Sequence, residues 1–267
     1  MAHHSRQLQI NLDDHGFDGH CQFLHTPFLY NELIIVQILG QKNCVLCDIP
    51  TKKDLCEPCY NHLPQLPLNQ CPICLWPVPT AEICGACLAE PPAFTRTIAA
   101  LRYTFPVDAM IRALKYETDL AIAPILANFF ITRFKATEKI IPDVIIPMPL
   151  HPIRLRERGF NQAMEISRYI SKHMGITLLP DSCQRIKHTP PQTGLAWKDR
   201  QKNIRKAFSC KIELSGKHVA LVDDVMTTGA TLNELAKILR KQGAAEISNW
   251  VIARTLPEVN QIGSHRL

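Results

Sequence analysis

The sequence has no long apolar run, and no stretch reaches the ~18 residues that a membrane-spanning helix requires. Its first twenty residues lack the basic-then-apolar order of a secretory signal. A strong charge imbalance is also missing, since the formal net charge is +6 over 267 residues. We therefore expect a soluble, cytoplasmic protein without a membrane span, with enough chain for one large domain or two smaller ones.

The most informative stretch is residues 219–231, with the sequence VALVDDVMTTGAT. The four apolar residues 219–222 are typical of a strand buried on both faces. Two carboxylates follow, and a turn of small residues then leads into a helix with apolar residues at helical spacing. The free N–H groups of a helix start, threonine hydroxyls and a glycine together suit a phosphate group. The stretch therefore predicts a sugar-phosphate site, the alternative being a plain strand–helix turn.

This pattern resembles the phosphoribosyl pyrophosphate (PRPP) motif of type I phosphoribosyltransferases. In that motif an apolar strand precedes two acids, and a T-T-G-x-T loop follows. The resemblance implies that the acids hold the ribose hydroxyls and that the loop holds the 5′-phosphate. The PRPP-binding residues predicted here are Asp223, Asp224, Thr227, Thr228, Gly229, Ala230 and Thr231.

Eight cysteines form four C-x-x-C knuckles between residues 44 and 87. The two thiolates of one knuckle reach a single ion together, so four knuckles predict two structural Cys₄ zinc sites. A disulfide framework is typical of exported chains instead, and a redox C-x-x-C normally occurs singly. The simplest pairing is sequential, and an interleaved pairing is the alternative that the spacing leaves open. Sequential pairing places Cys44, Cys47, Cys56 and Cys59 on one ion, and Cys71, Cys74, Cys84 and Cys87 on the other.

The remaining cysteines and the chain ends carry weaker signals. Cys183 and Cys210 are isolated and are expected to be ordinary thiols. Residues 1–40 are expected to form a poorly ordered extension, because their histidines are irregularly spaced for metal binding. A misassigned start codon is a further alternative. The histidines and cysteine concerned are His3, His4, His15, His20, Cys21 and His25.

From residue 97 onward, strand-like and helix-like patterns alternate. Strands are predicted at 97–103, 143–146, 219–222 and 247–254, helices at 108–116, 121–134, 160–174 and after residue 230, and a long loop at 184–206. This alternation predicts an α/β fold with a parallel sheet and ligands at the carboxyl ends of its strands. We expect a double zinc-binding module at 41–92, a phosphoribosyltransferase-like domain at 93–256 and a tail at 257–267.

Several motifs in order make the resemblance more specific. They are CPICLWPVP, ALRYTFPVDAMIRALKY, PMPLHPIRLRERGFNQA, TPPQTGLAWKDRQKNIRKAF and VALVDDVMTTGAT, and with the knuckles they cover residues 44 to about 255. The chain thereby resembles the ComF/GntX family, which implies a zinc-ribbon front end, a type I phosphoribosyltransferase-like domain, and a role in natural competence or use of external DNA. By the same resemblance Met148, Pro149, Leu150 and His151 form the pyrophosphate loop, and residues 190–194 form a flap over PRPP.

The positive charge is concentrated between His151 and Lys211, which contain 13 Lys and Arg against 4 Asp and Glu. Such groups neutralise phosphates, and an interleaved aromatic such as Trp197 can stack a base. The segment therefore predicts contact with single-stranded DNA, the alternative being an ordinary solvated surface. The residues predicted to contact phosphate or DNA are Arg154, Arg156, Arg158, Lys198, Arg200, Lys202 and Arg205.

Three functions fit these features. We favour a protein that handles single-stranded DNA and uses the PRPP site for PRPP or a related nucleotide, with other DNA-uptake proteins as partners. The second is a working phosphoribosyltransferase that binds PRPP with magnesium, although its catalytic residues and acceptor cannot be named from the sequence. The third is a zinc-ribbon adaptor on an inert scaffold, which the intact acidic pair at 223–224 disfavours.

Overall fold

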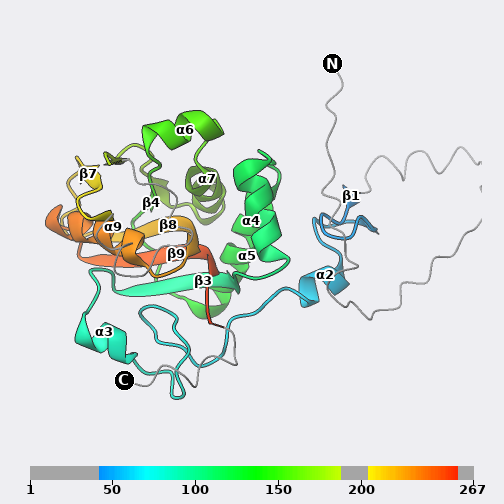
Figure 1. Ribbon diagram of the computed structural model, residues 1–267, viewed down its shortest axis with the longest axis horizontal. Coiled ribbons are helices and arrows are strands. Elements are labelled where there is room, and N and C mark those ends of the chain that lie inside the picture. Colours follow the sequence, from blue (N-terminus) through cyan, green and yellow to red (C-terminus); the bar gives the residue numbers. More distant parts are fainter. Residues whose placement is uncertain (1–41, 188–203, 258–267) are drawn as a thin grey trace, which may run out of the picture. The chain divides into compact units, whose positions relative to one another are not determined.

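The structure is a computed structural model that describes residues 42–187 and 204–257 (Figure 1). The chain divides into two compact units, residues 1–63 and 64–267. The first contains the antiparallel strands β1 (Lys42–Asn43) and β2 (Pro50–Thr51) and the short helix α2 (Glu57–Asn61). Because the division falls between Leu63 and Pro64, the second cysteine cluster belongs to the same unit as the main sheet. The boundary expected at residues 92–93 stays a prediction.

A five-stranded parallel sheet forms the centre of the second unit, in the order β3-β9-β8-β4-β5. The central strands β8 and β9 carry mostly buried residues, as expected for a parallel sheet covered on both faces. The α/β fold expected from the sequence is confirmed. The strands are β3 (Arg96–Arg102), β4 (Val144–Pro147), β5 (Thr177–Leu178), β8 (His218–Met226) and β9 (Glu246–Arg254).

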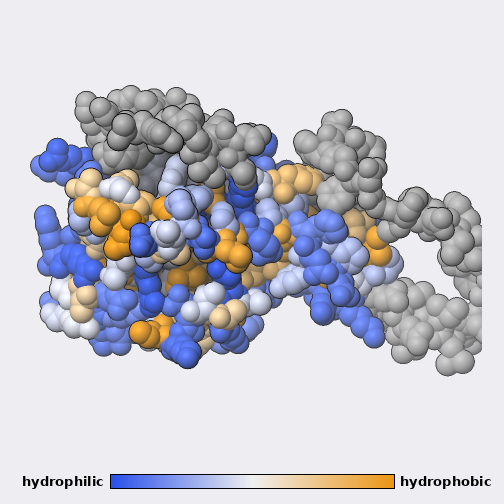
Figure 2. Space-filling model, turned by 90° about the horizontal axis from the view of Figure 1, so that it is seen from below, coloured by the Kyte–Doolittle hydropathy of each residue, from blue (hydrophilic) through white to orange (hydrophobic). Residues whose placement is uncertain are grey.

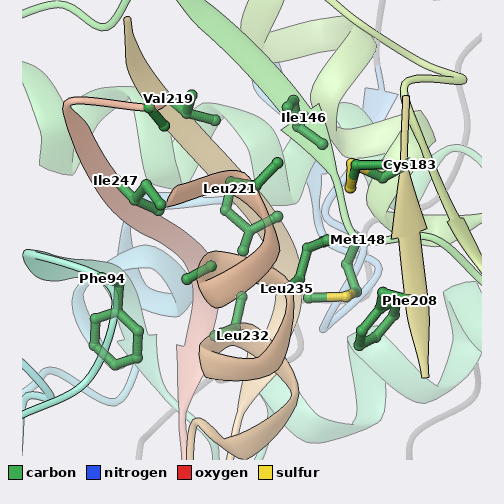
Figure 3. Packing of buried hydrophobic residues seen from close by; sticks show 14 of the residues in the cluster. Phe94, Ile146, Met148, Cys183, Phe208, Val219, Leu221, Leu232, Leu235 and Ile247 are labelled. Carbon is green, nitrogen blue, oxygen red and sulfur yellow. A yellow bond between two sulfur atoms is a disulfide. The ribbon is translucent and has the colours of Figure 1, made fainter. Parts of the chain in front are cut away.

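Helices cover both faces of this sheet (Figure 1). On one face lie α4 (Val107–Tyr116), α5 (Ile122–Thr137) and α7 (Gln162–Met174), and the Trp250 ring of β9 lies 5.0 Å from the Phe130 ring of α5. On the other face lies α9 (Ala230–Lys241), whose Leu232 and Leu235 pack beside Leu221, with Met148 and Phe208 close by (Figure 3). The sheet is therefore buried between two apolar layers.

A short antiparallel pair lies next to α9, formed by β6 (Cys183–Arg185) and β7 (Phe208–Cys210). The expectation that Cys183 and Cys210 are ordinary thiols is wrong, because they form a disulfide with Cα atoms 4.2 Å apart. The two cysteines face each other in register across the pair. The loop expected at 184–206 also begins and ends differently, since strand β6 extends to Arg185 and residue 204 is helical.

One further element has no counterpart in the sequence-based expectation, and one strand is longer than expected. Residues 152–158 form a short helix, α6 (Pro152–Arg158), with Pro152 at its first position and Gly159 in the left-handed conformation at its end. Strand β8 continues through both aspartates to Met226, because β9 pairs with it along this whole length, ending at Met226 and Arg254. The acidic pair therefore lies within the strand rather than beyond its end.

The surface of the described residues is mixed in character. On the face drawn in Figure 2, hydrophobic residues form separate areas among hydrophilic ones, as is normal for a globular protein. In the part of the chain that the structure describes, every helix is too short or too polar to span a bilayer. The second unit also contains the short helix α3 (Gly85–Ala89), which begins directly after Cys84.

Candidate functional site

The residues Thr227–Thr228–Gly229 connect β8 to α9 at the carboxyl edge of the sheet. Gly229 has φ +78°, a left-handed conformation that side-chain-bearing residues adopt only with strain. A Cβ atom added there would lie 2.6 Å from Cε of Met226. The Thr228 hydroxyl accepts a hydrogen bond from the N–H of Ala230 at 3.3 Å. The expected strand, tight turn and helix start are therefore all present, and the free N–H groups of α9 face the edge where parallel sheets bind ligands.

The two aspartates lie on opposite faces of β8, because side chains alternate along a strand. Asp223 shares the face of Val219 and Leu221, which pack against α9. Asp224 points to the other face, where it is 3% exposed and forms an ion pair with Lys115 of α4. Its Oδ1 also accepts a hydrogen bond from Nε2 of Gln162 at 3.1 Å. The two carboxylates thus have different surroundings despite being adjacent.

The pKa values of the two aspartates are shifted in opposite directions. Burial raises the pKa of Asp223 well above its usual value, and the neighbouring charge of Asp224 adds to the rise. Burial also acts to raise the pKa of Asp224, but the Lys115 ammonium outweighs it and holds that pKa below its usual value. Burial acts to lower the pKa of Lys115, and the Asp224 carboxylate raises it. Asp224 is therefore the carboxylate that stays ionised, and Asp223 carries the proton more readily.

The predicted pyrophosphate loop begins beside strand β8. Strand β4 pairs with β8 in parallel, so that Pro147 is opposite Val222, and the N–H of Met148 donates to the carbonyl of Val222 at 2.8 Å. Strand β4 therefore ends beside Val222, and β8 continues past this point to Met226. His151 caps α6, because its Nδ1 accepts from the N–H of Ile153 at 3.3 Å. Contact of residues 148–151 with a ligand stays a prediction.

The arginines of α6 have different partners. Arg154 donates to Glu157 at 3.1 Å, whereas Arg158 donates to Gln162 and lies 5.5 Å from the centre of the Tyr116 ring. Since Gln162 also binds Asp224, Arg158 is connected to the acidic pair through one side chain. Arg156 and Arg205 are exposed. The other predicted contacts, Lys198, Arg200 and Lys202, lie outside the described residues, as do Trp197, residues 190–194 and residues 1–40.

The cysteines form two clusters in the sequential pairing. One contains Cys44, Cys47, Cys56 and Cys59, the other contains Cys71, Cys74, Cys84 and Cys87, and within each cluster all Sγ atoms lie within 4.8 Å of one another. A tetrahedral zinc ion with Zn–S bonds of about 2.3 Å requires sulfur atoms about 3.8 Å apart. The Sγ atoms of Cys47 and Cys56 are 3.6 Å apart, and so are those of Cys74 and Cys84. The geometry of both clusters therefore fits a Cys₄ metal site.

Sequence reasoning did not identify three residues that contact this site. Lys115 and Gln162 bind Asp224 from two different helices, and Arg254, at the end of β9, donates to the carbonyls of Met226 and Thr227. Lys115 and Gln162 both occur within motifs that carry the family resemblance, ALRYTFPVDAMIRALKY and PMPLHPIRLRERGFNQA. Their partners follow only from the packing of α4 and α7 on the sheet.

Comparison with known proteins finds relatives that cover most of the chain. The chain is 36% identical over 211 residues to Competence protein F of Haemophilus influenzae, covering 76% of this chain and 91% of that protein. It is 31% identical over 221 residues to DNA utilization protein YhgH of Salmonella typhimurium, covering 80% and 97%. It is 26% identical over 240 residues to Competence protein ComFC of Bacillus subtilis, covering 79% and 95%. The family model for the phosphoribosyl transferase domain matches residues 158–257, which include the phosphate loop.

Proposed function

Because the chain belongs to the family of Competence protein F and DNA utilization protein YhgH, we propose that it acts in competence or DNA utilization with a bound phosphoribosyl ligand. The ligand is PRPP or a related nucleotide, held at the carboxyl edge of the sheet. The observation that carries this proposal is the turn at Gly229, which is left-handed and opens α9 at the end of the strand that contains the acidic pair. A 5′-phosphate at this turn receives the N–H groups and the positive dipole end of a 12-residue helix.

The proposed ligand also uses the residues on either side of the turn. Asp223 binds the ribose hydroxyls, since it lies on the α9 face of β8, whereas Asp224 is held by Lys115 and Gln162 and orients the strand. The backbone of residues 148–151, adjacent to β8, accommodates the diphosphate. Magnesium accompanies PRPP because a diphosphate carries its divalent cation into such sites.

Calorimetry of the purified protein with PRPP and magnesium tests the proposal. We expect saturable binding, and we expect Asp223→Asn to weaken it by up to about 10-fold, since an ordinary hydrogen bond contributes about 0.5–1.5 kcal/mol. Inorganic pyrophosphate with magnesium is the control ligand, because it lacks the ribose and should bind both proteins equally. Absence of PRPP binding to the unmodified protein would remove the phosphoribosyl part of the proposal.

A phosphoribosyl transfer reaction is the second candidate function. It is favoured by the intact loop and acidic pair, which are the parts that hold PRPP in transferases of this type. In such a reaction Asp223 orients the ribose while the N–H groups at the two loops stabilise the departing pyrophosphate. Release of pyrophosphate from PRPP in the presence of a nucleobase distinguishes this function from binding alone.

The macromolecular partner that we propose is single-stranded DNA. Among the described residues its support is the exposed Arg156 and the exposed Arg205 and Lys206, which belong to the basic segment 151–211. Replacing Arg205 and Lys206 with alanine should flatten the dependence of binding on salt. The slope of log affinity against log salt should become shallower by about 0.7 for each phosphate that the variant no longer neutralises.

The matched control for this DNA experiment is Arg133→Ala with Lys135→Ala. These residues are exposed on α5, on the opposite face of the sheet from α9, so the control should not change the slope. Fluorescence anisotropy of a labelled oligonucleotide, titrated at several salt concentrations, measures both variants. Equal slopes for the two double variants and the unmodified protein would exclude Arg205 and Lys206 from the DNA surface.

We also propose that each cysteine cluster binds one structural zinc ion. The proposal rests on the sulfur spacing within each cluster and on the two C-x-x-C knuckles that each contains. Each ion would link segments of chain that bury few apolar side chains of their own, so that metal binding supplies much of the local stability. The number of ions per chain is measured together with the variants of the next subsection.

A further inference from the structure

The side chain of Arg254 connects the second cysteine cluster to the phosphate loop. Arg254 is the last residue of β9, lies opposite Met226 of β8, and is 3% exposed. Its Nε donates to the carbonyl of Cys74 at 2.9 Å. Its Nη1 donates to the carbonyl of Met226 at 3.1 Å and also to that of Thr227. One buried guanidinium therefore binds a C-x-x-C knuckle and the first residues of the loop.

The buried guanidinium of Arg254 depends for its hydrogen bonds on both the cysteine knuckle and the phosphate loop. Among the residues that the structure describes, Arg254 forms no ion pair with an aspartate or glutamate, so backbone carbonyls supply its hydrogen bonds. A buried cation without compensating partners is strongly destabilising. Four thiolates around a zinc ion carry a net charge of −2, which would offset the positive charge of Arg254 across the Cys74 carbonyl.

The Cys74 carbonyl is held by the turn of its own knuckle. The N–H of Leu75 donates to the carbonyl of Cys71 at 2.9 Å, and the N–H of Cys71 donates to the carbonyl of Trp76 at 2.8 Å. The cysteine side chains of this turn point into the cluster, and Ile73, Cys74 and Leu75 pack against the core next to the sheet. Metal bound by Cys71 and Cys74 would fix the turn and thereby the position of the carbonyl that Arg254 binds.

The loop carbonyls that Arg254 binds lie next to the turn that is proposed to hold the phosphate. Met226 and Thr227 come directly before the Thr228–Gly229 turn, and the Met226 carbonyl also accepts from the N–H of Thr255 at 3.0 Å. Hydrogen bonds to these two carbonyls restrict the backbone from which the following turn starts. Displacement of Arg254 would therefore alter the loop even though all loop residues remain.

We propose that Arg254 is a positioning residue through which the second cysteine site holds the phosphate loop in its binding conformation. Metal at Cys71, Cys74, Cys84 and Cys87 is then required for phosphoribosyl binding, in addition to the stability it provides. Metal at the first cluster is not, because that cluster belongs to the separate unit 1–63. The metal requirement for PRPP binding rests on the proposed function, whereas the effect of metal on the conformation of the loop does not.

Two matched variants test the coupling: Cys71→Ser in the second cluster and Cys44→Ser in the first. Both residues are buried first members of a knuckle, with exposed fractions of 0% and 2%. Elemental analysis should give two zinc ions in the unmodified protein and one in each variant. Hydrogen exchange of the amides at 226–231 should become faster in Cys71→Ser and stay unchanged in Cys44→Ser. PRPP affinity should fall at least ~10-fold in Cys71→Ser only, as expected when a charged hydrogen-bond partner is misplaced.

Arg254→Lys separates the coupling from loss of the metal. Lysine keeps the positive charge but lacks the fork of donors that reaches both groups of carbonyls. This variant should retain two zinc ions and still show faster exchange at 226–231. Its control is Arg240→Lys, because Arg240 also donates to backbone carbonyls, those of Ala93 at 3.0 Å and Ala244 at 3.2 Å, away from the loop.

The outcomes discriminate between the two proposals. Unchanged exchange at 226–231 in both Cys71→Ser and Arg254→Lys would overturn the coupling, whatever the protein binds. Equal effects of Cys71→Ser and Cys44→Ser on the loop would overturn the assignment to the second site. Faster exchange in Cys71→Ser and Arg254→Lys alone would support the coupling even if the unmodified protein fails to bind PRPP, a failure that would count only against the proposed function.

Discussion

Gly229→Val is expected to abolish measurable PRPP binding while leaving the protein folded. Gly229 has φ +78°, and valine is strained in this left-handed region by at least about 1–2 kcal/mol. The new Cβ would also lie 2.6 Å from Cε of Met226, so the Met226 side chain would have to move. The methyl groups of the introduced valine would lie where the backbone is expected to approach the phosphate. Calorimetry with PRPP and magnesium measures the loss of binding, and urea unfolding measures the stability.

The control for this variant is Gly216→Val. Gly216 also has a left-handed φ, +71°, but it precedes β8 at the opposite end of the strand, and a Cβ there meets open space. Both variants should lose stability through backbone strain, Gly229→Val should lose more because Met226 must also move, and only Gly229→Val should lose ligand binding. Normal PRPP affinity in Gly229→Val would place the phosphate elsewhere than at the start of α9.

Lys115→Met is expected to destabilise the protein by about 3 kcal/mol at pH 7, at the lower end of the range for breaking a buried ion pair. The Lys115 and Asp224 side chains are only 19% and 4% exposed, so the variant leaves a buried carboxylate with the hydrogen bond from Gln162 and without its ammonium partner. Urea unfolding at constant ionic strength measures the difference in the free energy of unfolding.

The pH dependence of this variant has a definite sign. In the unmodified protein the Asp224 pKa is lowered in the folded state, so the carboxylate stabilises the fold above its unfolded pKa near 3.8, and this contribution is lost as the pH falls below that value. In Lys115→Met burial is no longer opposed by the ammonium, and the folded-state pKa rises above the unfolded one. The destabilisation should therefore shrink as the pH is lowered from 7 toward the unfolded pKa near 3.8.

Two further variants make the Lys115 result interpretable. Lys115→Met combined with Asp224→Asn removes both charges and should recover part of the lost stability, because no unpaired charge stays buried. Lys237→Met breaks the pair with Glu234 on α9, where the lysine side chain is 51% exposed, and should cost less than about 1 kcal/mol. A loss in Lys115→Met no larger than that in Lys237→Met would show that the Asp224 pair is not a buried structural contact.

Some features of this protein follow from short-range sequence information. Residues 219–222 are all apolar, and the turn after Asp224 needs glycine at one position, so strand, loop and helix start are all recognisable in one stretch. The C-x-x-C spacing likewise identifies the candidate metal ligands, because two thiolates of one knuckle lie on the same turn. Neither inference requires knowledge of distant contacts.

Tertiary structure decided the features that depend on residues far apart in the chain. Cys183 and Cys210 look isolated at a separation of 27 residues, and only the pairing of β6 with β7 brings them into a disulfide. The sequence also cannot show that adjacent aspartates differ, because Lys115 reaches Asp224 from α4, more than a hundred residues earlier. Whether each acid binds ligand or protein depends on which helix packs on its face of the sheet.

The placement of the second cysteine cluster has the same physical origin. From the sequence, the proline-rich knuckles form one module, since local composition changes after residue 92. The spacing by itself determined only that the two cysteines of one knuckle can share an ion, because ligand geometry within a knuckle is local, whereas the fold grouped the knuckles sequentially. Only the fold decided that Cys74 belongs with the sheet, because its carbonyl accepts from Arg254, 180 residues later, and long-range hydrogen bonds of a buried charge leave no pattern in the sequence between them.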